Sequence, residues 1–413
     1  MKSSIYIHIP FCRQKCDYCD FFSIEEKNRL GKKNDISDGY ILALINEAKF
    51  YARLYDIKDW SSIYIGGGTP GILSEKQIYS LLSGVKNAVQ NQTECEITVE
   101  VNPENVTEEK IEALKDSSAN RISMGIQAFD DRALRAVNRK SDEKTILKAL
   151  SILEKNWNGN LSVDFISGIP AQTYRSFENQ FEILDEFKKI NHISLYTLTI
   201  EENTPLSKKI QNGEIHFSYE RADKMWLLGR NILEKKGFFQ YEVSNFARPG
   251  FESIHNSSYW KQKNYIGVGS GAVGTAYDFS SQNALRWTNT LSIPKYVDFW
   301  RNFPEELKES VSVSLKTGFD LSLLPRKTEN LDAKTLEFEF LMTGFRLLSG
   351  VSSKEYFSRF GKSLEKRIGA ENGIFSEWKK KRLACVQINS DDKIYSLNKR
   401  GILLLNRFLE DLV

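Results

Sequence analysis

The sequence lacks several features that would place it in a specialised class of protein. It has only five cysteines and four histidines in 413 residues, and its net charge is 57 − 54 = +3. So small a charge argues against a dedicated nucleic-acid binder, whose surface field is strongly positive. No apolar run approaches the roughly 18 residues of a membrane span, and the opening MKSSIYIHIPFC has no cleavage pattern of a secretory signal. We therefore expect a cytoplasmic protein with no transmembrane segment and no nucleic-acid partner.

The residues that are present predict a large folded protein. Hydrophobic residues make up 41% of the chain and aromatic residues 12%, which excludes intrinsic disorder. The length predicts two or three domains. We divide the chain into four segments: 1–205, a barrel-like domain; 206–300, its extension; 301–330, a polar linker; and 331–413, a C-terminal domain.

Six short apolar or β-branched runs alternate with segments of helical period over the first 200 residues. The runs are Ser4–Ile9, Ser61–Ile65, Ile97–Val101, Arg121–Ile126, Leu161–Ile166 and His192–Thr199. Such alternation predicts an α/β fold of parallel βαβ units with right-handed connections. It does not decide between a barrel and an open sheet. Cysteines, a glycine-rich turn and polar residues stand at or just beyond the C-terminal ends of these runs. Parallel α/β folds build their sites at the carboxyl ends of their strands.

The C-terminal segment has a different pattern. Helical period returns after residue 331, two short strands follow at Ala384–Ile388 and Lys393–Leu397, and a last helix is predicted over 398–412. Helices followed by a hairpin predict a small α+β, winged-helix-like domain. The basic run Lys379–Arg382 is interpreted as a solvated helix end, because no aromatic residue is interleaved with it.

Three of the five cysteines lie within eight residues, in the pattern Cys12-x3-Cys16-x2-Cys19. Without an export signal, such a cluster indicates metal binding rather than disulfides. A structural zinc ion takes four ligands, and Cys95 and Cys385 are poorly placed to complete the set. Three thiolates fit a [4Fe-4S] cluster that keeps one iron open for another ligand. A closed zinc site is the alternative.

The stretch YIHIPFCRQKCDYCDF, which begins at Tyr6, resembles the opening of radical S-adenosylmethionine proteins. In that family the open iron is chelated by the amino and carboxylate groups of S-adenosylmethionine. More narrowly, the sequence is similar to the branch that contains oxygen-independent coproporphyrinogen III oxidase and the HemW-type haem chaperones. The resemblance covers nearly the whole chain. It implies an incomplete (βα)6 barrel, which agrees with the six predicted strands.

The resemblance also implies residues that contact S-adenosylmethionine. Tyr6 and Tyr18 flank the cluster, although Tyr6 is equally interpreted as a packed residue of its strand. Gly67, Gly68 and Thr69 belong to the turn Gly-Gly-Gly-Thr-Pro, whose bare backbone approaches the methionine ammonium.

Four polar residues on later units complete this predicted site. Glu100, in Val-Glu-Val-Asn-Pro, accepts from the ammonium or the ribose, and Gln127 and Asp164 face the ribose in the family. Arg139 offers a guanidinium to the methionine carboxylate. Any one of them alone would be interpreted as a solvated residue, but their order on successive units favours a shared site.

Two features bear on the branch of the family. The oxidases carry a further cysteine two positions after the third cluster ligand, where this sequence has Phe21. The stretch His255–Trp260 reads HNSSYW and matches the HNxxYW motif associated with the HemW type. Imidazole is a common haem ligand, so His255 is the candidate ligand, with Tyr259 and Trp260 as pocket walls. A structural histidine that steadies the following Gly-rich loop is the alternative.

Three hypotheses of function remain. The first is a haem chaperone that binds haem and passes it to an unidentified acceptor protein, with a [4Fe-4S] cluster and S-adenosylmethionine as cofactors. The second is an enzyme, an oxygen-independent coproporphyrinogen III oxidase or another radical enzyme acting on a tetrapyrrole, which would also need an electron donor. The third is a metal-stabilised nucleic-acid binder. Phe21 and the HNxxYW motif favour the first, and the low net charge disfavours the third.

Overall fold

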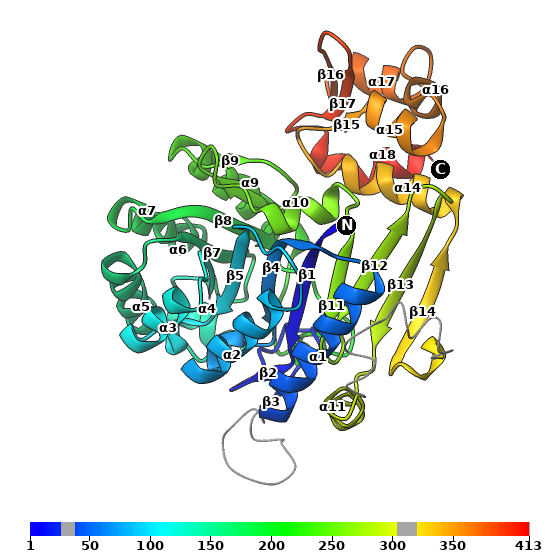
Figure 1. Cartoon of the computed structure of the whole chain (residues 1–413). Helices are drawn as coiled ribbons and strands as arrows, with labels where there is room; N and C mark the ends of the chain where they lie inside the picture. The colour runs from blue at the N-terminus through cyan, green and yellow to red at the C-terminus, as the bar shows by residue number, and fades with distance from the viewer. Residues whose placement is uncertain (26–37, 304–319, 413) are drawn as a thin grey trace.

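The computed structural model describes residues 1–25, 38–303 and 320–412, and a twelve-stranded mixed sheet forms its centre (Figure 1). Six neighbouring strands of this sheet are parallel and follow the chain order. They are β1 (Lys2–Ile9), β4 (Asp59–Gly67), β5 (Glu96–Val101), β6 (Arg121–Gln127), β7 (Asn160–Ser167) and β8 (Ile190–Thr197). The six predicted strands are therefore confirmed.

Further strands extend both edges of the sheet. Beyond β1 lie β11 (Tyr265–Val268), which is parallel to it, and the antiparallel β12 (Val273–Asp278), β13 (Asn283–Asn289) and β14 (Arg326–Leu331). Beyond β8 lie the antiparallel β10 (Asn245–Ala247) and β9 (Phe239–Gln240). In the described residues the sheet thus stays open rather than closing into a barrel, as expected of an incomplete one.

Part of the expected linker, 301–330, lies outside the described residues, namely 304–319. Within its described part, α11 ends at Arg301 and β14 begins at Arg326. The division into four segments stays a prediction.

Helices connect the parallel strands. They are α1 (Asp38–Leu54), α2 (Glu75–Lys86), α3 (Glu108–Asp116), α4 (Asp131–Ala136), α5 (Glu143–Asn156), α6 (Tyr174–Asn179) and α7 (Ile183–Glu186). The later part of the sheet is accompanied by α8 (Pro205–Gln211), α9 (Tyr219–Lys235), α10 (Ile254–Trp260) and α11 (Ile293–Arg301). Helix α2 begins at a capping box in which the Ser74 hydroxyl accepts from the Gln77 amide, as the sequence predicts.

The two faces of the parallel strands differ sharply in polarity. In β1, Ile5 and Ile7 are fully buried in the main core, while Ser4, Tyr6 and His8 lie on the opposite face. Register continues this alternation across the sheet, because Tyr6 pairs with Tyr64 of β4. The polar face of the later strands contains Ser62, Tyr64, Glu96, Thr98, Glu100, Arg121, Ser123, Ser162, Asp164, His192, Ser194 and Tyr196. Parallel sheets are usually apolar on both faces, so a polar face of this extent indicates a binding or catalytic site.

The C-terminal region has its own apolar core. It contains α14 (Ala333–Gly344), β15 (Val351–Ser352), α15 (Ser353–Phe360), α16 (Leu364–Ile368), α17 (Ile374–Lys380), β16 (Ala384–Ile388), β17 (Lys393–Leu397) and α18 (Leu405–Leu412). The hairpin occupies the predicted residues. A bidentate ion pair between Arg286 of β13 and Glu339 of α14, at 3.0 and 2.8 Å, links this region to the main sheet.

The last helix begins later than predicted. The Asn398 side chain accepts from the amides of Arg400 and Gly401, at 2.9 and 3.1 Å, and this turn delays α18 to Leu405. Among the described helices, none has both the length and the apolar composition that a membrane crossing requires.

Candidate functional site

A cavity of about 380 Å³ opens at the carboxyl ends of the parallel strands. Most of the predicted site residues line it, although they come from six separate parts of the chain. These are Cys12, Cys16, Tyr18, Cys19, Gly67, Gly68, Thr69, Glu100, Gln127, Arg139 and Asp164. The structure therefore brings together the residues that the resemblance grouped, with the exception of Tyr6.

The three cysteines meet hydrogen-bond donors at this cavity. The Thr69 hydroxyl donates to Cys12 Sγ at 3.6 Å, and Arg139 Nη1 donates to Cys16 Sγ at 3.4 Å. Burial raises the pKa of the Cys12 thiol, and it raises the pKa of Cys19 to about 11. Metal binding deprotonates a coordinating thiol outright, so donors beside the sulfurs suit thiolates that hold metal.

The cysteines are not arranged around one ion. Within residues 1–25, 38–303 and 320–412, no three His, Cys, Asp or Glu side chains converge closely enough to hold a single metal ion. A zinc ion needs its sulfur ligands at about 2.3 Å. Three thiols that line one cavity are of the ligand type that iron–sulfur clusters use.

The glycine turn fits tightly against the cysteine loop. Gly67 has φ +111°, and a Cβ there would lie 2.5 Å from the His8 ring. A Cβ on Gly68 would lie 2.6 Å from the carbonyl oxygen of Phe11, the residue before the first cysteine. The Thr69 amide donates to that same carbonyl at 2.8 Å. Side chains are therefore excluded from a turn that borders the cavity, and the turn fixes the start of the cysteine loop.

Glu100 of β5 and Asp164 of β7 are two of the carboxylates that line the cavity, and β6 lies between their strands. Glu100 accepts from the Tyr64 hydroxyl at 2.7 Å and from the Gly67 amide at 3.2 Å. Burial raises its pKa to about 7. Asp164 accepts from Ser123 Oγ at 3.2 Å, and burial raises its pKa as well. Both groups can accept hydrogen bonds from a guest that enters the cavity.

Arg139 and Lys15 are the basic residues that line the cavity, and Arg139 contacts Cys16. Its Nη2 donates to Asn102 Oδ1 at 2.7 Å and to the Gly125 carbonyl at 2.6 Å, while Nε has no hydrogen-bond partner among the described residues. Burial lowers its pKa, but Cys16 and Tyr18 beside it outweigh that effect and raise the pKa above its usual value. A buried, charged guanidinium with one donor unused fits an anionic group such as a carboxylate.

The two predicted tyrosines differ in their placement. Tyr18 lines the cavity, whereas Tyr6 does not. The Tyr6 hydroxyl lies 2.9 Å from His8 Nδ1, and its ring stacks on Tyr64 at 6.1 Å. This geometry corresponds to the packed strand residue that was the alternative for Tyr6. His8 is packed beside it, with Nε2 2.9 Å from the Phe22 carbonyl.

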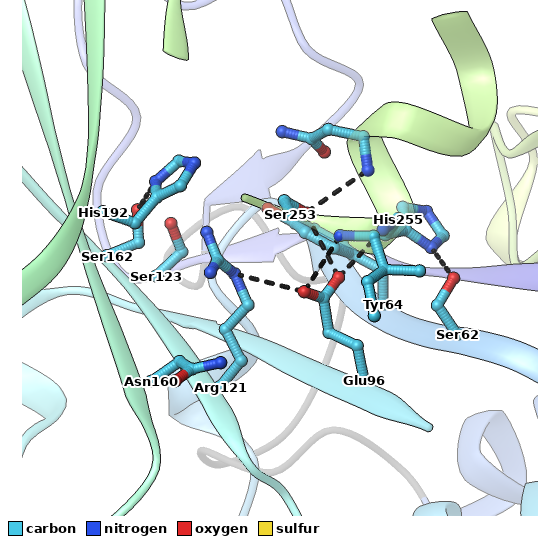
Figure 2. A network of polar contacts seen from close by, with 12 residues as sticks. Ser62, Tyr64, Glu96, Arg121, Ser123, Asn160, Ser162, His192, Ser253 and His255 are labelled. Atoms are coloured by element: carbon cyan, nitrogen blue, oxygen red, sulfur yellow. Dashed lines mark hydrogen bonds and ion pairs between the residues drawn. The ribbon is translucent and has the colours of Figure 1, made fainter. Parts of the chain in front are cut away.

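His255 lies away from the cavity, in the polar network of Figure 2. It is 1% exposed, with Nδ1 2.8 Å from Ser62 Oγ and Nε2 2.9 Å from the Tyr259 hydroxyl. Its ring stacks on Tyr64 with centroids 4.9 Å apart. Burial lowers its pKa to about 3, so the imidazole is neutral. Both ring nitrogens have hydrogen-bond partners. Neither partner belongs to the Gly-rich loop that follows the motif, which His255 would steady if its role were structural.

Glu96 holds the helix that carries His255. This carboxylate, 7% exposed, accepts from Ser253 Oγ at 3.1 Å and from the amides of Ile254 and His255 at 3.1 and 2.9 Å (Figure 2). Arg121 lies 4.0 Å from it. Glu96 and Arg121 are the first residues of β5 and β6, so α10 sits at the amino ends of the parallel strands, opposite to the cavity. Haem ligation by His255 would require α10 to move away from Glu96.

The other two residues of the motif are also engaged. Tyr259 packs edge-on against Tyr265, with centroids 4.7 Å apart. The Arg346 guanidinium lies over the Trp260 ring, 5.0 Å from its centroid. As placed, Tyr259 and Trp260 do not line the cavity of the cysteines.

Sequence reasoning missed several residues of the cavity. Asn102 lies between Arg139 and Thr69, and Tyr196 and Phe21 form part of the lining with 42% and 65% of their surfaces exposed. An Asn-Pro pair after a strand reads as an ordinary turn, so only the position of Asn102 beside Glu100 could have drawn attention to it.

Comparisons with known proteins agree with this geometry. The model of the radical SAM superfamily matches residues 6–184. The heme chaperone HemW of Lactococcus lactis subsp. lactis (strain IL1403) is 32% identical over 370 residues, which are 89% of this chain and 88% of that protein. HemW of Bacillus subtilis (strain 168) is 30% identical over 98% of this chain and 97% of its own length.

A solved structure shares the architecture. The coproporphyrinogen III oxidase HemN from Escherichia coli, described as a radical SAM enzyme, superposes with a TM-score of 0.75 over 100% of this chain and 90% of its own. The sequence identity is 19%, so this likeness concerns the fold alone. It supports the predicted α/β class with a C-terminal domain of helices and a small sheet.

Proposed function

The chain belongs to the HemW family of radical SAM proteins, and from this membership we propose that it is a haem chaperone, which binds haem and transfers it to an acceptor protein. The observation that carries the proposal is the cavity in which three thiols, a guanidinium and two carboxylates face one space. The proposal includes a [4Fe-4S] cluster and S-adenosylmethionine as residents of that cavity.

The residues of the cavity have distinct parts in this proposal. Cys12, Cys16 and Cys19 would hold the cluster, which supplies a site for electron transfer when it is bound. Arg139 keeps its charge and has Nε available for the methionine carboxylate. Glu100 accepts from the ammonium or the ribose.

Gln127 and Asp164 would face the ribose from the next two strands, and Tyr18 would flank the cluster. The glycines Gly67 and Gly68 let the turn pack against His8 and the Phe11 carbonyl where a Cβ would collide, and they thereby place its backbone at the border of the cavity. Phe21, at the rim, stands where the oxidases of the family carry a further cysteine, and this departure favours the chaperone over the oxidase.

Haem is the proposed cargo, with His255 as its ligand and Tyr259 and Trp260 beside it. Because both nitrogens of His255 are hydrogen-bonded in the folded seat of α10, ligation requires α10 to move. We therefore place the ligand role in an opened form of the protein and the structural role in the closed form.

One parallel experiment tests the function. The protein is reconstituted without oxygen, reduced, supplied with S-adenosylmethionine, and given either haem or coproporphyrinogen III. We expect a saturable Soret change with haem, transfer of the haem to an apo-haem protein, and no conversion of coproporphyrinogen. Formation of protoporphyrinogen would overturn the chaperone proposal in favour of the oxidase.

Matched variants separate the role of His255 from general damage. His255→Ala should weaken haem binding, whereas Tyr259→Phe keeps the imidazole and frees Nε2, so it should bind haem at least as well as wild type. A Soret titration that His255→Ala leaves unchanged would exclude His255 as the ligand.

A further inference from the structure

Asn102 connects two of the cysteines without touching either one. It follows β5 directly, is half-buried, and precedes Pro103. Arg139 Nη2 donates to its Oδ1 at 2.7 Å, and its Nδ2 donates to Thr69 Oγ1 at 3.3 Å. Arg139 and Thr69 are the two residues that donate to Cys16 and Cys12.

The direction of this chain of hydrogen bonds follows from the chemistry of its first member. A guanidinium has donors and no acceptor, so the Asn102 amide must turn its oxygen toward Arg139 and its NH2 toward Thr69. The Thr69 oxygen then accepts from Asn102, which leaves its O–H to point at Cys12 Sγ, 3.6 Å away. One guanidinium thus serves Cys16 directly and Cys12 through a relay.

Arg139 does not depend on Asn102 alone. The Gly125 carbonyl accepts from the same Nη2 at 2.6 Å, so the guanidinium keeps an anchor if the amide is removed. Asn102 Nδ2 also lies 3.5 Å from Glu104 Oε1, but Glu104 is already bonded by Ser141 through its other oxygen. The Thr69 arm is therefore the one that the amide controls most directly.

We propose that Asn102 is a positioning residue that orients the hydrogen bonds to Cys12 and Cys16 and thereby raises the reduction potential of the cluster they hold. The inference rests on the cluster assignment of the proposed function. Hydrogen bonds to the cysteine sulfurs stabilise the more negative, reduced cluster, and groups outside the ligand set commonly tune metal sites in this way.

The test is a redox titration of the reconstituted cluster, followed by electron paramagnetic resonance. Asn102→Leu keeps the side-chain size and removes both hydrogen bonds. We expect its midpoint potential to fall by about 59 mV, which is a tenfold change in the equilibrium of a one-electron couple. Thr69→Val, which removes only the hydroxyl, should also lower the potential.

The double variant Asn102→Leu/Thr69→Val shows whether Asn102 acts through Thr69 or whether the two residues affect the potential independently. If Asn102 acts through Thr69, the double variant lowers the potential by less than the sum of the two single changes. Strict additivity would overturn the relay. A wild-type potential in Asn102→Leu would overturn the whole proposal, whatever the potential of Thr69→Val.

Thr107→Ala is the matched control on the same segment of chain. Its hydroxyl caps α3 by accepting from the Lys110 amide at 3.2 Å, so its loss lowers stability without touching the cavity. The potential should stay at the wild-type value, whereas a shift equal to that of Asn102→Leu would mean that general destabilisation causes the effect. If Asn102→Leu binds no cluster, Asn102→Ser, which also removes the amide, is titrated in its place, and a wild-type potential there overturns the proposal. Absence of a cluster from the wild-type protein would instead contradict the proposed function.

Discussion

At the amino ends of the parallel strands, Glu96 accepts three hydrogen bonds from Ser253 and α10, and His255 uses both ring nitrogens. At the carboxyl ends, Arg139 keeps an unused Nε, and Glu100 accepts two hydrogen bonds beside a cavity of about 380 Å³. A cavity of about 610 Å³ also borders Glu96 at the amino ends. We call the amino end the closed end because its polar groups are hydrogen-bonded to one another, and the carboxyl end the open end because Arg139 keeps an unused donor there.

The difference teaches how one set of strands serves stability and binding. At the amino ends, the Glu96 carboxylate accepts hydrogen bonds from fixed protein donors in place of water, and these bonds hold α10 in position. The carboxyl-end groups keep part of their hydrogen-bonding capacity for a guest, and burial acts against the ionised form of Glu100 in the absence of one. Substitutions at the amino ends should therefore mainly lower stability, whereas substitutions at the carboxyl ends should mainly impair binding.

The largest expected effect is at the open end. Cys16→Ala removes one of three thiolates, so bound iron should fall from about four atoms per chain to nearly none after anaerobic reconstitution. Iron content and the visible absorption of the cluster measure the loss. Cys385→Ala is the control, because Cys385 lies in β16 of the C-terminal region and contacts Ser396. Full iron in Cys16→Ala would contradict the open-end assignment.

The next effect is at the closed end. Glu96→Ala leaves the Ser253 hydroxyl, two amides and Arg121 without their buried acceptor, and it should lower the free energy of unfolding by about 4 kcal/mol. Denaturant titration measures this change. Glu100→Ala, the matched carboxylate at the cavity, should lose less, since water in the cavity can replace it. Equal losses would erase the distinction between the two ends.

The pH dependence of stability isolates the open end further. The pKa of Glu100 is about 7 in the folded protein, above the 4.5 of the free side chain, so its stabilising contribution is complete below pH 4.5 and is lost as the pH rises toward 7. Glu100→Gln should therefore gain stability relative to wild type between pH 5 and pH 8, by about 3 kcal/mol at most. A difference between the two proteins that stays constant with pH would show that burial does not act against the charge.

The strands and the cysteines were predictable because their signals are local. Apolar residues at Ile5, Ile7 and Ile9 alternate with polar ones, and Cys12, Cys16 and Cys19 lie on one loop. The grouping of the cavity residues came from the resemblance, and the cavity lining agrees with it except at Tyr6.

The placement of His255 was not predictable in the same way. Ser62, the partner of Nδ1, lies 193 positions away in the chain, and Glu96, which accepts from the His255 amide, lies 159 positions away, so no local pattern could reveal either contact. Only the contact of Nε2 with Tyr259 is local, at a spacing of four residues. The short strands β9 to β14 were missed for a related reason. β11 pairs with β1 and β10 pairs with β8, and the remaining strands pair with these or with one another, whereas their own sequences carry little alternation.

The smallest expected effect concerns Tyr64, which touches both ends. Its ring stacks on His255, and its hydroxyl donates to Glu100. Tyr64→Phe keeps the ring and removes the hydroxyl, so Glu100 loses a donor and its pKa should rise further. The loss of stability should be about 2 kcal/mol at pH 8, where the carboxylate is charged, and about 1 kcal/mol at pH 5, where it is protonated.

Hydrogen exchange of the α10 amides completes this measurement, because it reports on the closed end alone. If the ends are separable, Tyr64→Phe leaves that exchange at the wild-type rate while the stability changes with pH. Faster exchange in α10 would mean that the hydroxyl at the cavity also holds the helix, since the ring stack on His255 is unchanged. The closed and open ends would then be one cooperative unit, and a guest at Glu100 would alter access to His255.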